Sequence, residues 1–215
     1  MAVVLGCLRW RVRSSGGRGG RRMLPLSAGA ALLASLCVAA AAAAATPARA
    51  ADASGAPYAW GLNTVGELGD GTTTNHNSPQ AITLATGVTA TAVSAGGTFS
   101  LAIGSDGNLY AWGDNTTAEL GDGTATNHKS PEVITLATGV KPTAISAGEV
   151  DSLAIGSDGK LYAWGDNTTG ELGDGTTTSH NSPEAITLAT GVTATAVSAG
   201  GTFSLAIGSD GKLYA

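Results

Sequence analysis

The chain has little cysteine, and all of it lies near the start. The 215 residues include two cysteines, Cys7 and Cys37, both within residues 1–50. Residues 51–215 therefore cannot form a disulfide, a thiolate metal site or a cysteine nucleophile.

Positive charge is also scarce beyond residue 50. Residues 51–215 hold all 16 acidic side chains and only four lysines, a formal charge of 4 − 16 = −12. Residues 1–50 hold seven arginines and no acid, which brings the whole chain to −5. Nucleic-acid binding depends on Lys and Arg neutralising phosphates, so the acidic part argues against a nucleic-acid partner.

The basic first part has the layout of an export signal. A stretch containing three arginines precedes an apolar run over residues 24–45, and a small-x-small motif ends at Ala50. We predict a signal peptide over residues 1–50, cleaved after Ala50, and a short linker over residues 51–57. An uncleaved membrane anchor is the alternative, because the run is about long enough to span a bilayer. Either way the rest of the chain is expected to be extracellular or at the cell surface.

Self-similarity is the strongest signal in the remainder. The tetrapeptide Tyr-Ala-Trp-Gly recurs with its tryptophan at Trp60, Trp112 and Trp164, a period of 52 residues. Residues 88–107 recur without change as residues 192–211. A fixed period of this length indicates one supersecondary unit that is stacked repeatedly.

Each unit has the pattern of short strands. Apolar and polar residues alternate over 99–103, an Asp-Gly turn follows, and 109–112 forms the return strand. Residues 91–95 and 81–84 are the expected third and fourth strands. Apolar side chains occur on both faces of the 109–112 strand, as they do where sheets are covered on both sides. Four short strands per repeat are typical of a propeller blade.

Several motifs carry a family resemblance. Residues 93–103, the Ala111-Trp112-Gly113 strand and the Glu119-Leu120-Gly121 loop resemble the regulator of chromosome condensation repeat. The resemblance implies an all-β fold, with propeller blades of four antiparallel strands and three 52-residue repeats over residues 58–215, the last one truncated. The positions that recur in every copy are expected to be structural: Trp60, Trp112, Trp164, Gly61, Gly113, Gly165, Leu68, Leu120, Leu172, Gly69, Gly121 and Gly173.

Three repeats do not close a ring, since propellers commonly have four to eight blades. The period demands a tryptophan directly after Ala215. The simplest interpretation is a fragment of a ring of about seven blades. Further C-terminal sequence would supply the remaining blades; closure by an oligomer and an open arc are the alternatives.

None of the polar residues repeated in the loops predicts catalysis, a metal site or a cofactor. His76, His128 and His180 recur once per blade, too dispersed to share a zinc ion. The Asp-Gly-Thr loops lack the ligand spacing of a calcium site and are typical of Asx turns. The glutamates before each Leu-Gly have no partner fixed nearby, and a repeated surface presents the same group at separate points. We therefore predict that the protein is not an enzyme.

The copies differ at a few positions that are candidates for partner binding. Residues 97–99 become Glu149, Val150 and Asp151 in the second copy, and Lys129 stands where the other copies have Asn. Drift explains such differences as well, but Glu149, Asp151 and Lys129 are the predicted partner-binding residues. The family often has His at the position of Asp151, which weakens the transfer of residue roles. Two Asn-Thr-Thr segments, beginning at Asn115 and Asn167, also match a glycosylation acceptor.

The predicted function is a secreted or cell-surface module that binds a protein through repeated propeller loops. The resemblance extends to exported bacterial members of the family, among them propeller inhibitors of β-lactamase. A structural or wall-associated repeat region of a longer extracellular protein is the alternative. Chromatin binding and guanine nucleotide exchange, which the family name implies, are disfavoured by the charge and the export signal. A membrane contact is expected only if the signal is not cleaved.

Overall fold

The computed structural model describes residues 55–215. The predicted signal peptide at 1–50 and most of the predicted linker lie outside the described residues. Between Gly55 and Ala215 the structure contains strands, turns and loops but no helix, and so no helix there is long and apolar enough to cross a membrane. The all-β prediction is confirmed.

Thirteen strands form four antiparallel sheets. In chain order they are β1 (Tyr58–Gly61), β2 (His76–Ala81), β3 (Ala90–Ala95), β4 (Phe99–Gly104), β5 (Leu109–Gly113), β6 (His128–Ile134), β7 (Pro142–Ala147), β8 (Asp151–Gly156), β9 (Leu161–Gly165), β10 (His180–Ile186), β11 (Ala194–Ala199), β12 (Ser204–Gly208) and β13 (Leu213–Tyr214). The sheets β3–β6 and β7–β10 are complete four-stranded blades. The sheet β1–β2 is an N-terminal half-blade, and the sheet β11–β13 is a C-terminal partial blade.

The β4–β5 hairpin forms where the sequence places an Asp-Gly turn. Ala102 pairs with Tyr110 and Phe99 with Gly113, in an unbroken antiparallel register. Gly107 has a φ of 73°, a conformation that costs a residue with a Cβ about 1–2 kcal/mol. The Asp106 carboxylate accepts a hydrogen bond from the backbone N–H of Asn108 and so fixes the turn. The same turn recurs between β8 and β9.

The fourth strand of each blade does not lie where the sequence predicts it. Residues 81–84 are the predicted strand, but β2 spans His76–Ala81, and β6 and β10 begin at the equivalent histidines. The Ser-Pro within these strands favours a loop on sequence grounds. Proline is tolerated because this strand lies at the outer edge of the sheet, and because the pairing of β6 with β5 shifts register between Ala111 and Gly113.

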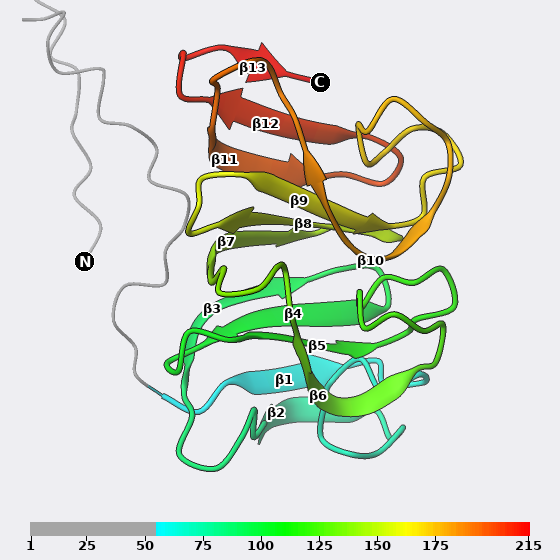
Figure 1. Ribbon diagram of the computed structural model, residues 1–215. Helices are drawn as coiled ribbons and strands as arrows, with labels where there is room; N and C mark the ends of the chain where they lie inside the picture. Colours follow the sequence, from blue (N-terminus) through cyan, green and yellow to red (C-terminus); the bar gives the residue numbers. More distant parts are fainter. Residues whose placement is uncertain (1–54) are drawn as a thin grey trace, which may run out of the picture. The chain divides into compact units, whose positions relative to one another are not determined.

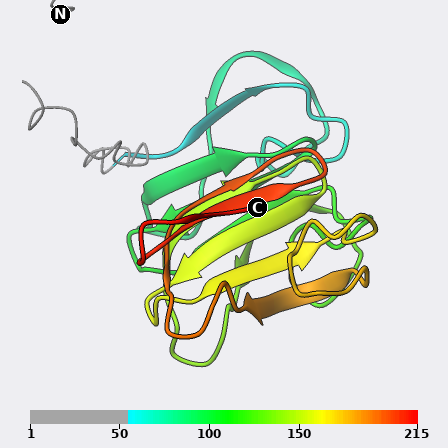
Figure 2. The ribbon, with the colours of Figure 1, turned by 90° about the horizontal axis from the view of Figure 1, so that it is seen from above.

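Neighbouring blades pack face to face. The innermost strands β3, β7 and β11 lie next to one another, and the sheets stack from β1–β2 to β11–β13 (Figure 1). The view from above shows successive sheets rotated within that stack (Figure 2). Every residue of β5 and β9 is buried, on both faces of the sheet. Burying one large apolar side chain stabilises the fold by about 1.5–3 kcal/mol, so the interfaces between blades supply the core.

The two ends of the stack are not covered in this way. Trp60 in β1 is 61% exposed and Leu213 in β13 is 67% exposed, whereas Trp112 and Trp164 are at most 4% exposed. The same strand motif is therefore buried or open according to whether a neighbouring blade is present.

Candidate binding rim

The antiparallel register places the long loops at one end of every blade. Phe99, Gly113 and His128 lie opposite one another, so the β3–β4 turn and the β5–β6 loop emerge together. We call this end the long-loop rim; it consists of residues 62–75, 96–98, 114–127, 148–150, 166–179 and 200–203. The Asp-Gly turns emerge at the other end, the hairpin rim, at residues 105–108, 157–160 and 209–212.

A buried asparagine organises each long loop. Asn115 is 0% exposed, and its side-chain N–H groups donate to the Asp122 carboxylate at 3.1 Å and to the Thr124 carbonyl at 3.2 Å. Its side-chain oxygen accepts the backbone N–H of Leu120 at 3.0 Å. Asn63 and Asn167 form the equivalent bonds in their loops. These asparagines were missed as functional positions, because the sequence shows Asn115 and Asn167 only as part of an acceptor tripeptide and gives no signal at Asn63. Since Asn115 and Asn167 are fully buried, glycosylation at them is excluded in this fold.

The aspartate of each Asp-Gly-Thr segment caps a turn and binds the recurring histidine. In the first loop, Asp70 accepts the backbone N–H of Thr72 at 2.9 Å, and its second oxygen lies 2.7 Å from Nε2 of His76. Burial raises the pKa of Asp70, but the bonds from Thr72, His76 and Asn63 outweigh it and lower the pKa to about 2. His128 and His180 pair with their own aspartates at 2.8 Å. Each histidine is thus held within its own loop, and in residues 55–215 no group of three or more His, Cys, Asp or Glu could hold a metal ion.

The glutamate before each Leu-Gly closes its own loop. The side chain of Glu119 is 2% exposed and accepts the backbone N–H of Thr117 at 2.9 Å. Its carbonyl accepts two bonds from the next blade, from Nε1 of Trp164 at 2.8 Å and from the Ser152 hydroxyl at 2.7 Å. Glu67 receives the same pair from Trp112 and Ser100. The recurring tryptophan therefore joins one blade to the loop of the blade before it.

The recurring glycines and leucines fit this joint. A Cβ on Gly121 would lie 2.6 Å from Nε1 of Trp164, and a Cβ on Gly69 would lie equally close to Trp112. Gly113 has a φ of 108°, and a Cβ there would meet the Thr98 carbonyl at 2.6 Å. The leucines between these motifs are buried in the core: Leu68, Leu120 and Leu172.

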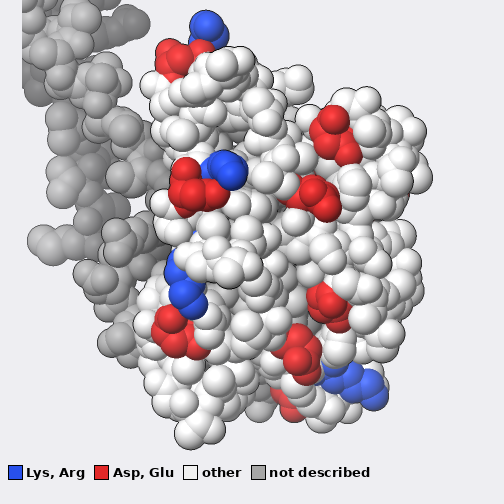
Figure 3. Space-filling view, viewed as in Figure 1, with Lys and Arg blue, Asp and Glu red and all other residues white. Residues whose placement is uncertain are grey.

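The long-loop rim is acidic. Its partly or fully exposed carboxylates are Glu67, Asp70, Asp114, Asp122, Glu149, Asp166 and Asp174. Lys129, where β6 leaves the rim, is the basic residue beside them in the described chain. On the hairpin rim, by contrast, Lys160 and Lys212 lie 3.6 Å and 3.2 Å from aspartates of their own turns. Figure 3 shows acidic groups spread over the right side of the view, with one basic group at its lower end, and acidic and basic groups side by side on the left.

The three residues predicted for partner binding lie in different environments. Glu149 is exposed in the β7–β8 turn, near the innermost strands. Lys129 is exposed on the outermost strand β6, where its carbonyl accepts the backbone N–H of Gly71 at 2.9 Å. Glu149 thus belongs to the long-loop rim, whereas Lys129 lies on β6 directly after it.

Asp151 lies in a different environment, and its burial corrects the prediction that it contacts a partner. It is 0% exposed, so it offers no surface to a partner, because it lies against the next blade where Ser204 donates to it at 3.2 Å. Its other carboxylate oxygen has no hydrogen-bond partner in the described residues. Burial raises the pKa of Asp151 to about 6, with the charges of Glu171 and Asp166 adding to the shift and the Ser204 bond opposing it.

Comparison with known proteins agrees with this architecture. The family model for the regulator of chromosome condensation (RCC1) repeat matches residues 54–103, 106–155 and 158–207. The chain belongs to the RCC1 repeat family. In these repeats each match begins before β1, β5 or β9 and ends in the second strand of the following blade.

Two curated relatives and one solved structure illustrate the similarity. The E3 ubiquitin-protein ligase HERC2 of Homo sapiens is 31% identical over 75% of this chain and 4% of its own length. The ultraviolet-B receptor UVR8 of Arabidopsis thaliana is 32% identical over 74% of this chain and 36% of its own length. The crystal structure of Prp20p from Saccharomyces cerevisiae has a TM-score of 0.63 and 25% identity, over 70% of this chain and 39% of that one. The chain thus spans less than half of the length of each of these three proteins.

Proposed function

We propose that the chain is a secreted or cell-surface module that binds a protein partner through its long-loop rim, without catalysis. The repeated presentation of nearly identical acidic loops on one rim supports this proposal. Complementary charge steers association and fixes register, so the rim suits a partner with a basic surface. The binding of Prp20p to Gsp1p and histones is a precedent for protein partners among RCC1-like structures.

The electrostatic part of the proposal can be tested at Glu149. This side chain is exposed and, within the described residues, makes no side-chain hydrogen bond, so Glu149→Lys changes the charge of the rim without removing a hydrogen bond of the fold. Glu184→Lys is the matched control, because it makes the same exchange at an exposed position on the outer strand β10. Partner captured from culture medium should fall at least fivefold with Glu149→Lys and stay near the wild-type level with Glu184→Lys.

Ionic strength and removal of the N-terminal segment provide two further tests of the proposal. Rim binding should weaken as ionic strength rises, because the Debye length falls from about 10 Å at 0.1 M to about 3 Å at 1 M. N-terminal sequencing of the chain from the medium should begin at Ala51 if residues 1–50 are removed. Recovery of the chain only inside cells would contradict the extracellular assignment, and capture insensitive to both charge and salt would contradict the rim.

A further inference from the structure

Two contacts between blades have the same backbone bonds. We call the contact of β3–β6 with β7–β10 the first joint, and the contact of β7–β10 with β11–β13 the second joint. At the first joint, the backbone N–H of Gly97 donates to the Gly148 carbonyl at 3.0 Å. At the second joint, the backbone N–H of Glu149 donates to the Gly200 carbonyl at 3.0 Å. The two joints can therefore be compared bond by bond.

A bond to serine on the innermost strands is repeated as well. The Ser94 hydroxyl accepts the backbone N–H of Ala147 at 3.0 Å in the first joint. The Ser146 hydroxyl accepts the backbone N–H of Ala199 at 2.9 Å in the second joint. Each joint thus has two backbone donors in equivalent positions, and these four amides report separately on the two contacts.

The joints differ at one buried position, which is Phe in the first and Asp in the second. The ring of Phe99 lies against Gly96, where a Cβ would meet it at 2.6 Å. Asp151 has the equivalent position, and a Cβ on Gly148 would collide with its Oδ1. Asp151 is 0% exposed, and Oδ1 has no hydrogen-bond partner in the described residues. A carboxyl group thus stands where the first joint buries an aromatic ring.

The other oxygen of Asp151 has one long hydrogen bond. In the first complete contact of this type, the Ser152 hydroxyl donates to the Glu119 carbonyl at 2.7 Å. Ser204, the equivalent serine one repeat later, donates to Oδ2 of Asp151 at 3.2 Å. Bonds from a hydroxyl to a carboxylate are commonly about 2.5–2.7 Å long, so this one stabilises the ionised form only weakly.

The charged groups around Asp151 are all acidic. Asp166 and Glu171 lie in the loop that follows β9, and their charges raise the pKa of Asp151. Glu149 precedes it by two residues, in the turn before β8. Strands β7, β11 and β12 and the turn at residues 200–203 contain no charged residue. Asp151 forms no salt bridge within residues 55–215.

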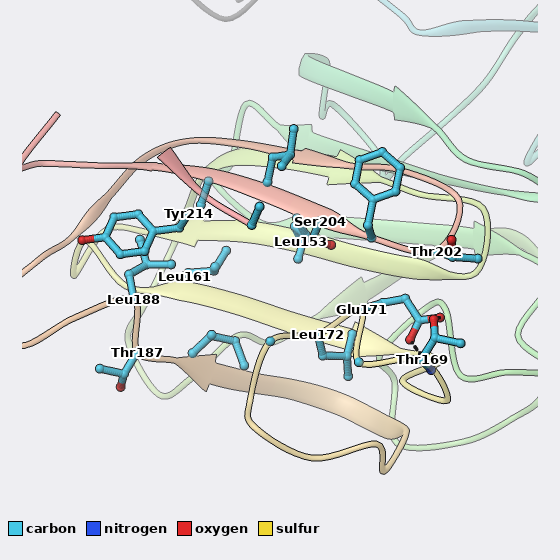
Figure 4. A pocket seen from close by; sticks show the side chains of 17 residues that line it. Leu153, Leu161, Thr169, Glu171, Leu172, Thr187, Leu188, Thr202, Ser204 and Tyr214 are labelled. Atoms are coloured by element: carbon cyan, nitrogen blue, oxygen red, sulfur yellow. Dashed lines mark hydrogen bonds between the residues drawn. The ribbon is translucent and has the colours of Figure 1, made fainter. Parts of the chain in front are cut away.

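Asp166 and Glu171 are ionised over the range in which Asp151 titrates. Burial raises the pKa of each, but hydrogen bonds outweigh it, among them bonds from Thr168 to Asp166 and from Thr169 to Glu171, and lower the pKa below its ordinary value. Figure 4 shows the Thr169 hydroxyl beside Glu171, to which it donates at 2.6 Å. Ionisation of Asp151 therefore adds a buried negative charge near two existing ones.

We propose that Asp151 makes the second joint a pH-sensitive contact, which is closed while the carboxyl is protonated and opens as the carboxyl ionises. A neutral carboxyl is buried at modest cost, whereas an unpaired buried charge is strongly unfavourable. Opening separates Gly200 from Glu149 and so releases the turn that carries Glu149. Regulation of partner binding by this release rests on the function proposed above, but the opening of the joint does not.

The size of the effect follows from the pKa of Asp151 in the two states. Burial raises this pKa from 3.8 to about 6 in the closed joint, and water restores it to near 3.8 in the open one. The closed joint is thus fully stable below about pH 4 and loses stability as the pH rises to 6. The opening equilibrium should increase about tenfold between pH 5 and pH 7. The first joint has Phe99 instead and should not respond.

Amide hydrogen exchange of the purified chain, as its host processes it, measures opening at both joints in one sample. Protection factors, corrected for the pH dependence of exchange itself, should fall about tenfold from pH 5 to pH 7 at Glu149 and Ala199. At Gly97 and Ala147 they should change by less than about twofold. The same pH course at both joints would overturn the proposal. No partner is needed, so this failure is distinct from a failure of the chain to capture a partner.

Three variants assign the effect to the carboxyl. Asp151→Asn keeps the size of the side chain and removes its charge, and Asp151→Phe restores the residue of the other two copies. In either variant the protection of Glu149 should no longer depend on pH. Glu184→Gln removes an exposed carboxylate on β10 and should leave the fall of about tenfold in place. A fall that persists in the two Asp151 variants would contradict the proposal. If one of them does not fold, the other and the comparison between joints in the wild type still decide.

Discussion

The indole Nε1 of Trp164 donates a hydrogen bond of 2.8 Å to the carbonyl of Glu119, 45 residues earlier in the chain. The bond crosses from the second complete blade to the loop that follows β5 in the first. Both partners are buried, so a break in this bond leaves a polar group without water. The contact between blades therefore combines apolar packing with a hydrogen bond of defined geometry.

A methyl group at this joint should destabilise the fold. Gly121→Ala places a Cβ 2.6 Å from Nε1 of Trp164 at a position with a φ of 74°. The backbone conformation alone costs about 1–2 kcal/mol, and overpacking adds about 1–3 kcal/mol. Gly175→Ala bears the first cost without the second, because Gly175 has a φ of 83° and open space around it. It should therefore remain clearly more stable than Gly121→Ala in urea unfolding. Equal losses in the two variants would contradict the role assigned to the indole.

The long loops should depend on their buried asparagines. Asn115→Ala leaves the buried N–H of Leu120 without its acceptor, which costs about 1–3 kcal/mol, and also removes the donor to Asp122. Asn77→Ala makes the same exchange on the exposed face of β2 and should change the free energy of unfolding by less than about 0.5 kcal/mol. If thermal unfolding shows the two variants to be alike, Asn115 does not organise its loop.

The sequence predicts the repeat, the strand class and the structural positions because each rests on local periodicity. The Tyr-Ala-Trp-Gly period and the Asp-Gly turns specify the second and third strands of a blade without knowledge of their neighbours. The fourth strand was misplaced because it is held by the edge of β5 and not by its own pattern. A Ser-Pro segment carries no strand signal until a bulged edge accommodates it.

The site was predicted less well than the fold, and Asp151 shows why. The charge of Asp151 favours a surface position on sequence grounds. The other two copies have Phe at this position, and the difference predicted a surface residue adapted to a partner. The structure places this position in the interface between blades, where Phe99 is 1% exposed. Burial there is set by the next blade, whose Ser204 is 53 residues away in the sequence, and the pattern of a single repeat does not reveal it. The pairing of each loop histidine with the aspartate six residues before it was also missed, because the turn that brings the two side chains together has no periodic signal.

The pairing of Asp70 with His76 should stabilise the fold only above the range in which Asp70 titrates. Hydrogen bonds depress the pKa of Asp70 from 3.8 to about 2 in the folded state, so its contribution is present above pH 4 and is lost as the pH falls towards 2. Asp70→Asn should therefore cost up to about 1 kcal/mol at pH 6 and progressively less below pH 4. Urea titrations at several pH values measure the difference, with Glu184→Gln as an exposed control. A constant difference across the range would contradict the assignment.

Asp151 should act in the opposite direction, because its pKa is raised. In the unfolded chain the carboxyl titrates near 3.8 and in the folded chain at about 6, so the folded state binds more protons between these values. Stability contributed by the protonated group is then full below about pH 4 and falls as the pH rises to 6. One pKa unit corresponds to about 1.4 kcal/mol, and partial relaxation of the site reduces the effect to about 1–2 kcal/mol in all.

Asp151→Asn should remove this dependence of the free energy of unfolding on pH, so that the variant becomes more stable relative to the wild type from pH 4 to pH 7. Asp151→Phe, which restores the residue of the other two copies, should gain as well. Parallel stability profiles for the wild type and Asp151→Asn would show that the buried carboxylate is already neutralised by a partner, contrary to the unpaired oxygen seen in the interface.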